Sequence, residues 1–387
     1  MLKTQRVIGI IDRLAKVKGV NRFSTFFLYL LPPTAAFITY LIARSLATII
    51  ESAFVRAYVK SLGIQSNFLL PGLNPYLPIV YGWIGIVVAI IVHEGAHGVI
   101  ARAKGLPVNS AGLLFFLIIP VGAFVEVDEK EMEKAHPSNS MRVLAAGPGS
   151  NLVVSLFTLV LLLLLLGTMY PAYGNLLIYA VADGGPAYNA GVKGGQAIVL
   201  AVDNVNVSSI EEFEKMLSKH MPNETLVLTA YLPENRSVIE YKIRLGSRPD
   251  NVSKAYAGVL LVSLDKVLDS YRSFRVENIM SYLVWPTLSP STIPFSDHLA
   301  PFYTSSVGSS FYAIANLLYW TWVVNFNVSV FNALPIYPLD GGQALKVFLK
   351  KVLEKKVSLT GQNIIVWIIS LIMLSLLLAT IIVPQIF

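Results

Sequence analysis

Long apolar stretches separated by short polar ones dominate the pattern along this chain of 387 residues. A helix of about 20 mostly apolar residues is long enough to cross the roughly 30 Å hydrocarbon core of a bilayer. Five stretches reach that length: 26–50, 79–100, 143–169, 311–334 and 364–386. The pattern therefore predicts a polytopic α-helical membrane protein with five membrane helices, and a sixth, short helix is expected after Asp340.

A different pattern interrupts the membrane helices between Tyr170 and about Leu268. Short apolar runs alternate there with turn residues, which is typical of strands, and one stretch after two serines has the spacing of an amphipathic helix. The three runs are 176–181, 197–202 and 226–232, and the helical stretch is 210–217. The insert is therefore expected to be a small domain with both α and β elements.

These patterns divide the chain into five parts. Before the first membrane helix, five apolar residues recur at helical spacing among basic ones, which predicts an amphipathic helix on the membrane surface: Val7, Ile10, Ile11, Leu14 and Val17. The alternative for this part is a disordered basic tail. The expected parts are a basic segment (1–24), a first membrane part (25–170), the inserted domain (171–265), a linker or surface segment (266–308) and a second membrane part (309–387).

Composition supports the membrane assignment and indicates sidedness. Hydrophobic residues make up 55% of the chain and charged residues 14%, which excludes an ordinary soluble enzyme. The net charge of +7 comes from basic residues beside membrane segments, so lipid rather than nucleic acid is the expected partner. By the positive-inside rule, the groups at 3–22, 102–104 and 346–356 are cytoplasmic. The inserted domain is then extracytoplasmic in a multi-pass protein of the cell membrane.

A short apolar run lies between the second and third membrane helices. Residues 113–119 are too few to cross a bilayer, and Pro120 and Gly122 interrupt the run. Irregular backbone at membrane depth must be covered by protein or by a water-filled cavity. The segment 113–127 is therefore predicted to form a re-entrant β-hairpin, whose strand edge could hold an extended substrate.

The second apolar stretch contains the run HEGAH. His93 and His97 are four residues apart, so they lie on one face of a helix and can bind a single ion, with Glu94 beside them. Ionisable groups at membrane depth are costly and usually mark function. A hydrogen-bonded polar cluster between helices is the structural alternative. The favoured hypothesis is a zinc site of the hydrolase type.

A catalytic zinc ion usually has three protein ligands and one open position. Asp340 is the best candidate for the third ligand, because it follows two prolines that break the fourth stretch and precedes two glycines that permit close backbone approach. Five rivals lie in a charged stretch that is more simply a solvated loop: Glu126, Asp128, Glu129, Glu131 and Glu133.

Residue chemistry indicates a mechanism for this site. Zinc lowers the pKa of bound water towards about 7 and polarises a carbonyl. Glu94 is expected to accept the proton of that water and to pass it to the leaving amide nitrogen. Asn332 is expected to contact the substrate through its amide, or else to cap the helix end.

These motifs resemble those of the site-2 protease family of intramembrane zinc metalloproteases, in the branch with a PDZ domain. HEGAH matches the family's HExxH element, the run 332–342 matches its N-x-x-P and L-D-G element, and the run 146–151 is similar to its G-P-x-x-N element. The resemblance covers roughly residues 77–345. It implies cleavage of a transmembrane protein within or beside the bilayer, which is called regulated intramembrane proteolysis. From the residues, Gly147 to Asn151 are expected to set the start of the third helix, with Asn151 bonding across helices.

The insert resembles a PDZ domain through Gly185–Pro186–Ala187, Ala190–Gly191–Val192, Gly195 with Ile198, and Asp203–Asn204. It departs from the family at Gly194 and Gln196, where proline and aspartate are usual. A PDZ domain can bind a peptide as an added edge strand. A steric filter above the active site and a packing domain without ligand are the other interpretations.

Two other classes of function remain as alternatives. A metal-binding transporter could use intramembrane histidines, but it would more naturally show internal repeats and several broken helices. A catalytically silent membrane adaptor could keep the same architecture, yet the residues of the predicted site are all intact. The sequence does not indicate which protein is cleaved or the oligomeric state.

Overall fold

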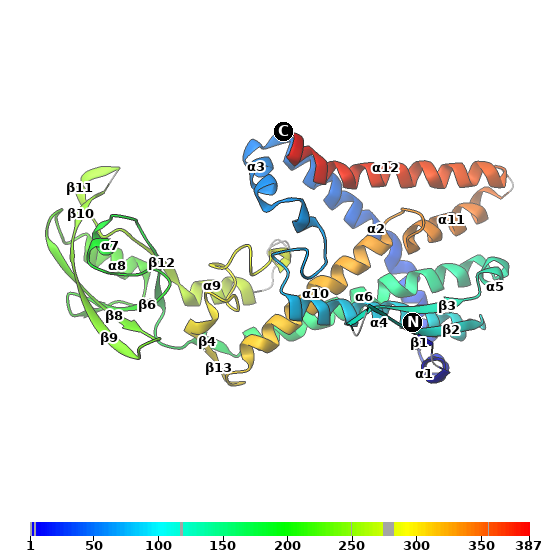
Figure 1. Cartoon of the computed structure of the whole chain (residues 1–387), viewed down its shortest axis with the longest axis horizontal. Helices are drawn as coiled ribbons and strands as arrows, with labels where there is room; N and C mark the ends of the chain where they lie inside the picture. Colours follow the sequence, from blue (N-terminus) through cyan, green and yellow to red (C-terminus); the bar gives the residue numbers. More distant parts are fainter. Residues whose placement is uncertain (1, 4, 117–118, 249, 274–281, 355) are drawn as a thin grey trace. The chain divides into compact units, whose positions relative to one another are not determined.

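The computed structural model describes residues 2–3, 5–116, 119–248, 250–273, 282–354 and 356–387. The chain divides into two compact units, Met1–Val160 with Leu317–Phe387, and Leu161–Asn316 (Figure 1). We call them unit 1 and unit 2 and describe each by itself. Unit 1 is built from helices and one small sheet, and unit 2 from several antiparallel sheets with short helices.

The helices of unit 1 follow the apolar stretches of the sequence. Four of them are long and apolar enough to cross a membrane: α2 (Val20–Glu51), α4 (Ile79–Ala103), α6 (Pro137–Leu166, most of it in this unit) and α12 (Leu359–Ile386). The shorter helices are α1 (Gln5–Ala15), α3 (Ala53–Leu62), the 3-10 helix η1 (Ile64–Asn67), α5 (Glu129–Lys134) and α11 (Asp340–Leu353). The short helix expected after Asp340 is thus confirmed as α11.

The predicted fourth span forms α10 (Phe311–Ala333), a continuous helix of 23 residues. It is not among the four helices that are apolar enough to cross a membrane, so a fifth span stays a prediction. Its sequence contains four asparagines, and much of it is enclosed by other parts of the protein, with Tyr319, Trp320, Val323 and Val324 fully buried. A helix surrounded by protein can carry polar groups, because neighbouring helices satisfy their hydrogen bonds.

A three-stranded sheet lies beside these helices, in the order β1–β2–β3. Strands β2 (Val108–Phe116) and β3 (Ile119–Val127) pair antiparallel, and β1 (Leu2–Lys3) pairs with β2. The predicted hairpin is present and begins earlier than expected; residues 117–118 lie outside the described part of the chain. Because β2 lies between β1 and β3, β3 is an edge strand of this sheet. Re-entry of the hairpin into a bilayer stays a prediction.

The amphipathic helix predicted before the first span is also present. Helix α1 covers Gln5–Ala15, so Val17 lies beyond its end. Asp12 on α1 forms an ion pair with Arg102 on α4, with 2.5 Å between Oδ1 and Nε. This pair joins the N-terminal helix to the helix that contains HEGAH.

Unit 2 has an antiparallel sheet in the order β12–β5–β6–β8–β9. Its strands are β5 (Leu176–Val181), β6 (Ala197–Val202), β8 (Thr225–Leu232), β9 (Ser237–Arg244) and β12 (Val259–Ser263), with β7 (Val205–Asn206) paired to β6. Helix α8 (Ile210–Leu217) packs Phe213 and Met216 into the same buried core as the strands. The three predicted strands and the predicted helix are therefore confirmed as elements. The remaining elements of this sheet region are α7 (Pro186–Asn189), β10 (Gly246–Arg248) and β11 (Asn251–Tyr256).

The segment expected to be a linker or surface piece, 266–308, contributes buried residues to unit 2 and also has exposed ones. It begins inside helix α9 (Leu264–Arg272) and includes the 3-10 helix η3 (Ala300–Phe302) and strand β13 (Tyr303–Ser305), which pairs with β4 (Met169–Pro171). Tyr303 donates a hydrogen bond from its hydroxyl to the Leu264 carbonyl, at 2.6 Å. Tyr282, Phe295 and Leu299 are almost completely buried. Residues 274–281 of this segment lie outside the described part of the chain.

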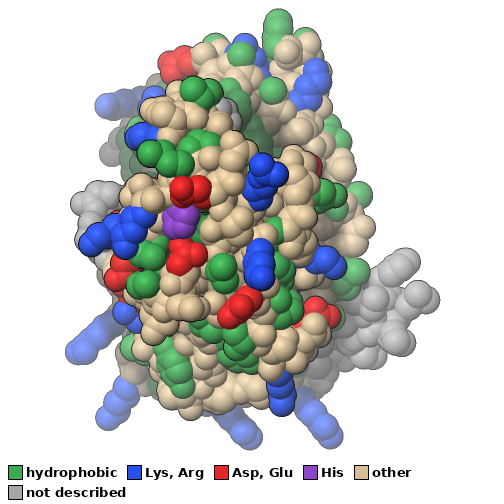
Figure 2. All heavy atoms as spheres, turned by 90° about the vertical axis from the view of Figure 1, so that its left-hand side faces the viewer, with side chains coloured by type: hydrophobic (Ala, Val, Ile, Leu, Met, Phe, Trp, Pro, Cys, Tyr) green, Lys and Arg blue, Asp and Glu red, His purple; other side chains and the backbone are tan. Residues whose placement is uncertain are grey.

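Figure 2 shows one face of the molecule, on the side where β8 to β11 lie in Figure 1. Acidic and basic side chains are interspersed over the face in view, with hydrophobic side chains between them. Mixed charges of this kind are typical of a surface in contact with water. Exposed and half-buried residues alternate along β9. Successive side chains of a strand point to opposite faces, and one face of β9 points outward.

Candidate metal site

Helix α4 places the first two candidate ligands by regular spacing. It runs without interruption through the motif, so His93 and His97 stand one turn apart on one face, with 4.8 Å between their ring centroids. The helix lies close to α10 because Gly85 has no side chain: an added Cβ would lie 3.0 Å from the Trp320 carbonyl oxygen. The local helical geometry is thus sufficient to bring the two imidazoles together.

The third candidate comes from a break between two helices. Helix α10 ends at Ala333 and α11 begins at Asp340, so the two prolines of the motif lie in the connection. An added Cβ at Gly341 would collide with the carbonyl oxygens of Ala333 and Leu334, and one at Gly342 with the backbone at Ile336. The two glycines therefore allow the start of α11 to pack directly against the end of α10, which fixes the position of Asp340.

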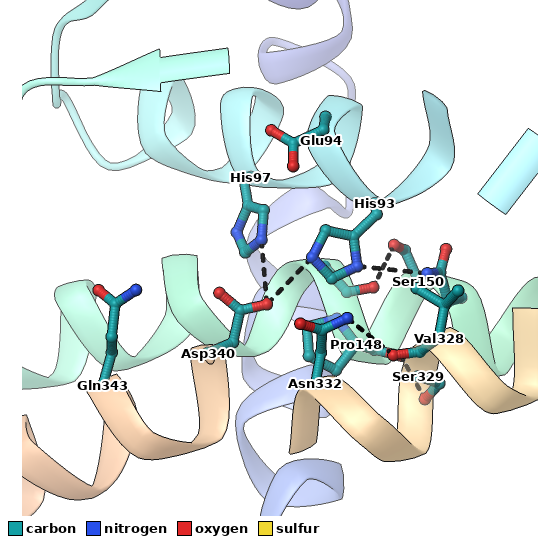
Figure 3. A network of polar contacts seen from close by, with 12 residues as sticks. His93, Glu94, His97, Pro148, Ser150, Val328, Ser329, Asn332, Asp340 and Gln343 are labelled. Carbon is teal, nitrogen blue, oxygen red and sulfur yellow. Dashed lines mark hydrogen bonds and ion pairs between the residues drawn. The ribbon is translucent and has the colours of Figure 1, made fainter. Parts of the chain in front are cut away.

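The three side chains meet in one place (Figure 3). Asp340 Oδ2 lies 3.0 Å from His93 Nε2 and 3.3 Å from His97 Nε2. Among the described residues, these three form the one cluster of at least three potential ligands for a metal ion, with all ligand atoms within 4.8 Å of one another. In a tetrahedral zinc site with bonds of about 2.0–2.1 Å, neighbouring ligand atoms lie about 3.3 Å apart, so the spacing fits.

The five rival carboxylates are not part of this cluster in the described structure. Glu126 accepts a hydrogen bond from the Ser110 hydroxyl, and Asp128 caps α5 by accepting one from the Glu131 amide. Glu131 itself forms an ion pair with Lys134 on the exposed side of α5. Their positions agree with the simpler interpretation as a polar loop and a short helix.

Hydrogen bonds on the far side of the rings test whether the cluster suits a metal. His97 Nδ1 lies 2.7 Å from the Val143 carbonyl oxygen, which only accepts, so Nδ1 carries the proton and Nε2 has a free lone pair. That lone pair faces a carboxylate oxygen, and the contact is repulsive unless a proton or a metal ion lies between them. An ionised carboxylate and imidazole lone pairs are what zinc requires.

Glu94 lies next to the two imidazoles on α4 (Figure 3). Its Oε2 accepts a hydrogen bond from the Val125 amide of β3 at 3.0 Å, which ties the carboxylate to the edge strand of the hairpin. A cavity of about 690 Å³ is lined by the three cluster residues, Glu94, Val125 and Asn332, among others. Four of the five predicted site residues therefore lie together, and the fifth, Asn332, faces the same cavity.

Asn332 lies one residue before the end of α10. Its side-chain amide donates a hydrogen bond to the Val328 carbonyl of the preceding turn, at 3.0 Å. This is not an N-terminal cap, since the side chain satisfies a carbonyl near the C-terminal end of the helix. Its contact with a substrate stays a prediction.

Helix α6 contributes residues that sequence reasoning did not place in the site. The prediction that Gly147 to Asn151 set the start of the third helix is wrong, because α6 begins at Pro137 and Pro148 lies inside it. The prediction that Asn151 bonds across helices is confirmed: its Nδ2 lies 3.2 Å from His93 Nδ1. Gly147 faces the imidazoles, since an added Cβ would lie 2.6 Å from His93 Nε2. The spacing of four residues between Gly147 and Asn151 places both on one face of a helix, and this pattern could have indicated that both face the site.

Two imidazoles and a carboxylate around a common point, with a glutamate beside them, define a metal-binding site of the type found in metallohydrolases. Residues 81–376 match the model of peptidase family M50, the family of the site-2 proteases. This is more than half of the chain, and the chain belongs to that family. The predicted resemblance to the site-2 protease family is therefore confirmed.

Relatives among curated proteins agree with the family. The chain is 28% identical over 298 residues to a protein of Methanocaldococcus jannaschii that is named as uncharacterized, over 76% of this chain and 64% of the relative. It is 24% identical over 306 residues to a Nostoc protein named as a zinc metalloprotease, over 67% of this chain and 82% of the relative. It is 25% identical over 205 residues to an Arabidopsis thaliana protein named as a homolog of membrane-bound transcription factor site-2 protease, over 52% of this chain and 36% of the relative.

The aligned part thus spans less than two thirds of the length of the first and third of these relatives. The family consists of zinc metalloproteases, and zinc, predicted from the HExxH spacing, is confirmed as the cofactor at the level of the family. The helices that contain the candidate ligands include α4, which is long and apolar enough to cross a membrane.

Proposed function

We propose that this chain is an intramembrane zinc metalloprotease that hydrolyses peptide bonds within or next to the transmembrane segment of membrane-protein substrates. The observation that carries the proposal is the convergence of His93, His97 and Asp340 from two different parts of unit 1. A helix that simply packed against others would have no use for three such groups at one point, since each is costly to bury.

In this proposal, His93, His97 and Asp340 hold the zinc ion. When bound, zinc supplies Lewis-acid chemistry, which makes water acidic and polarises a carbonyl group. Glu94 acts as the general base: its carboxylate takes the proton from water and delivers it to the nitrogen of the leaving amine. The hydrogen bond from the Val125 amide positions this carboxylate without protonating it, because the amide only donates.

The hairpin provides the means to hold an extended substrate. Strand β3 is an edge strand of its sheet, and its residue Val125 lines the same cavity as the candidate ligands. A peptide that adds to this edge would satisfy its backbone amides by strand pairing, as an unwound membrane segment requires. Asn332, which lines the same cavity, is proposed to add an amide contact. Asn332→Ala should then raise KM while leaving bound zinc unchanged.

The sheet of unit 2 is proposed to be a PDZ-like domain outside the cytoplasm, acting as a peptide binder or as a steric filter. Its sheet with α8 packed on it supports a PDZ-like arrangement. The N-terminus and the metal site are proposed to lie on the cytoplasmic side, on the basis of the basic residues that flank the membrane helices. Cleavage as a regulated step in the release of membrane-tethered proteins is a further part of this proposal.

The test compares purified wild type, Glu94→Gln and Glu133→Gln with single-span membrane substrates in the presence of zinc. Glu133 is an exposed residue of α5 outside the metal cluster, so its variant is the matched control. We expect Glu94→Gln to keep zinc but to lose at least about 100-fold in turnover, and Glu133→Gln to cleave like wild type. Equal cleavage by wild type and Glu94→Gln would remove the assignment of the base.

The same preparations separate the alternatives. A transporter would move zinc across the membrane of sealed vesicles. A protease would instead retain its zinc, and metal analysis should find about one ion per chain. An adaptor would bind a membrane partner without cutting it. Cleavage that survives a zinc chelator would show that the metal does not take part.

A further inference from the structure

We propose that Asn151 is a positioning residue, which holds His93 in the orientation and tautomer that a metal ion needs. The proposal rests on the role of His93 as a zinc ligand and adds a residue to the site. It starts from the nitrogen of His93 that does not face Asp340: this Nδ1 lies 3.2 Å from the side-chain amide nitrogen of Asn151. Asn151 is completely buried.

One face of α6 supports both imidazoles. Val143, Gly147 and Asn151 are spaced four apart, so they lie in a row along the helix. The Val143 carbonyl contacts His97 Nδ1, and Asn151 contacts His93 Nδ1. Gly147, between them, approaches the rings so closely that an added Cβ would lie 2.6 Å from both Cε1 and Nε2 of His93. In Figure 3 the His93 ring lies between Asp340 and the part of α6 that contains Ser150.

The chemistry of a neutral imidazole explains why this contact matters. Only one ring nitrogen carries a proton, and the other has the lone pair that binds a metal. For His93 to bind zinc through Nε2, its proton must be on Nδ1, and a buried N–H needs an acceptor. The Asn151 side chain can provide one, because its Oδ1 is buried and has no hydrogen-bond partner in the described structure.

The side-chain amide of Asn151 can form a hydrogen bond with His93 both when a metal ion is bound and when it is absent. In the structure, the Asn151 nitrogen faces His93 Nδ1, which suits the tautomer in which Nε2–H donates to Asp340, 3.0 Å away. A half-turn of the amide about its last bond presents Oδ1 instead, and the two ends have nearly the same size. Then Nδ1–H donates to Oδ1 and the lone pair of Nε2 is free for the metal. The Val143 carbonyl can only accept, so His97 stays in the metal-ready tautomer throughout.

The competing interpretation is that Asn151 only packs α6 against α4. Three variants of the full chain separate the two: Asn151→Leu, which keeps the size but has no acceptor; Asn151→Asp, which keeps an acceptor; and Asn325→Leu as matched control. Asn325 is also completely buried, but its amide donates to the Thr321 carbonyl of its own helix. The measurement is the zinc affinity of each purified protein, by competition with a chelator of known affinity.

We expect Asn151→Leu to bind zinc about 10–100-fold more weakly than wild type, and Asn151→Asp and Asn325→Leu to stay within about threefold. The absorption spectrum of the cobalt-substituted protein should change in Asn151→Leu and be restored in Asn151→Asp, since it reports the geometry around the metal. Wild-type affinity in Asn151→Leu, or equal loss in Asn151→Leu and Asn151→Asp, would overturn the proposal. If Asn151→Leu does not fold, weak zinc binding by Asn151→Asp alone overturns it. A wild-type protein that binds no zinc would instead overturn the proposed function.

Discussion

The two segments that supply the candidate ligands reach a common point by opposite means. In α4 an uninterrupted helix is enough, because residues four apart share a face. In the second segment α10 must end, the chain must turn through 334–339, and α11 must begin with Asp340. The first half of the site is therefore fixed locally, whereas the second half depends on packing between helices.

Glycine shows the same contrast. Gly95 lies within HEGAH, and an added Cβ there would meet nothing within 4 Å. At Gly341 an added Cβ would overlap backbone carbonyl oxygens, which cannot move aside as the end of a flexible side chain can. The α4 motif thus has room for a methyl group at Gly95, and the start of α11 has none at Gly341.

The largest effect is expected from removal of the ligand that the broken segment supplies. Asp340→Ala should lower bound zinc from about one ion per chain to almost none, and proteolysis with it, because two imidazoles alone hold zinc weakly. Metal analysis of the purified protein measures this. Asp12→Ala is the control: it also removes a carboxylate, but one that lies on α1 and pairs with Arg102, so this variant should keep its zinc. If Asp340→Ala retained zinc while His97→Ala lost it, the two segments would not share one ion.

A smaller effect is expected from Gly341→Ala, set against Gly95→Ala. The first should destabilise the protein by about 1–3 kcal/mol and weaken zinc binding, since the backbone must shift to admit the methyl group. The second should be neutral or stabilising by about 0.5–1 kcal/mol, because alanine is the better helix former. Thermal unfolding in detergent, followed with and without zinc, gives both values. Equal behaviour of the two variants would contradict the contrast between the segments.

Much of this contrast could be read from the sequence. Helical spacing places His93 and His97 together, and the paired prolines and glycines around Asp340 indicate a break with close backbone approach. The strands and the helix of the insert follow from short apolar runs and turn residues, as β5, β6, β8 and α8 show. These features depend on residues near one another in the chain.

Contacts between distant residues could not be predicted in the same way. Nothing in the sequence pairs the Val125 amide with Glu94, or Asn151 with His93, because each contact depends on how two elements pack. The structure of the segment 266–308 could not be predicted for the same reason. Its buried aromatic residues have no regular spacing, and their burial depends on the rest of unit 2. The polar residues of α10 lower the mean hydropathy of the helix. The helix can contain them because other parts of the protein surround much of it.

The smallest effect is expected from the hydrogen bond that ties the broken segment to α12. The Tyr337 amide donates to the Ser370 hydroxyl at 2.9 Å, and this hydroxyl donates in turn to the Val366 carbonyl. Ser370→Ala should cost about 1 kcal/mol by leaving the Tyr337 amide without its acceptor, and should leave zinc bound. Thr380→Ala is the matched control on the same helix, since its hydroxyl donates only to the Leu377 carbonyl. A lower unfolding temperature for Ser370→Ala than for Thr380→Ala would show that α12 stabilises the connection 334–339. No difference would mean that the packing of the glycines alone positions Asp340.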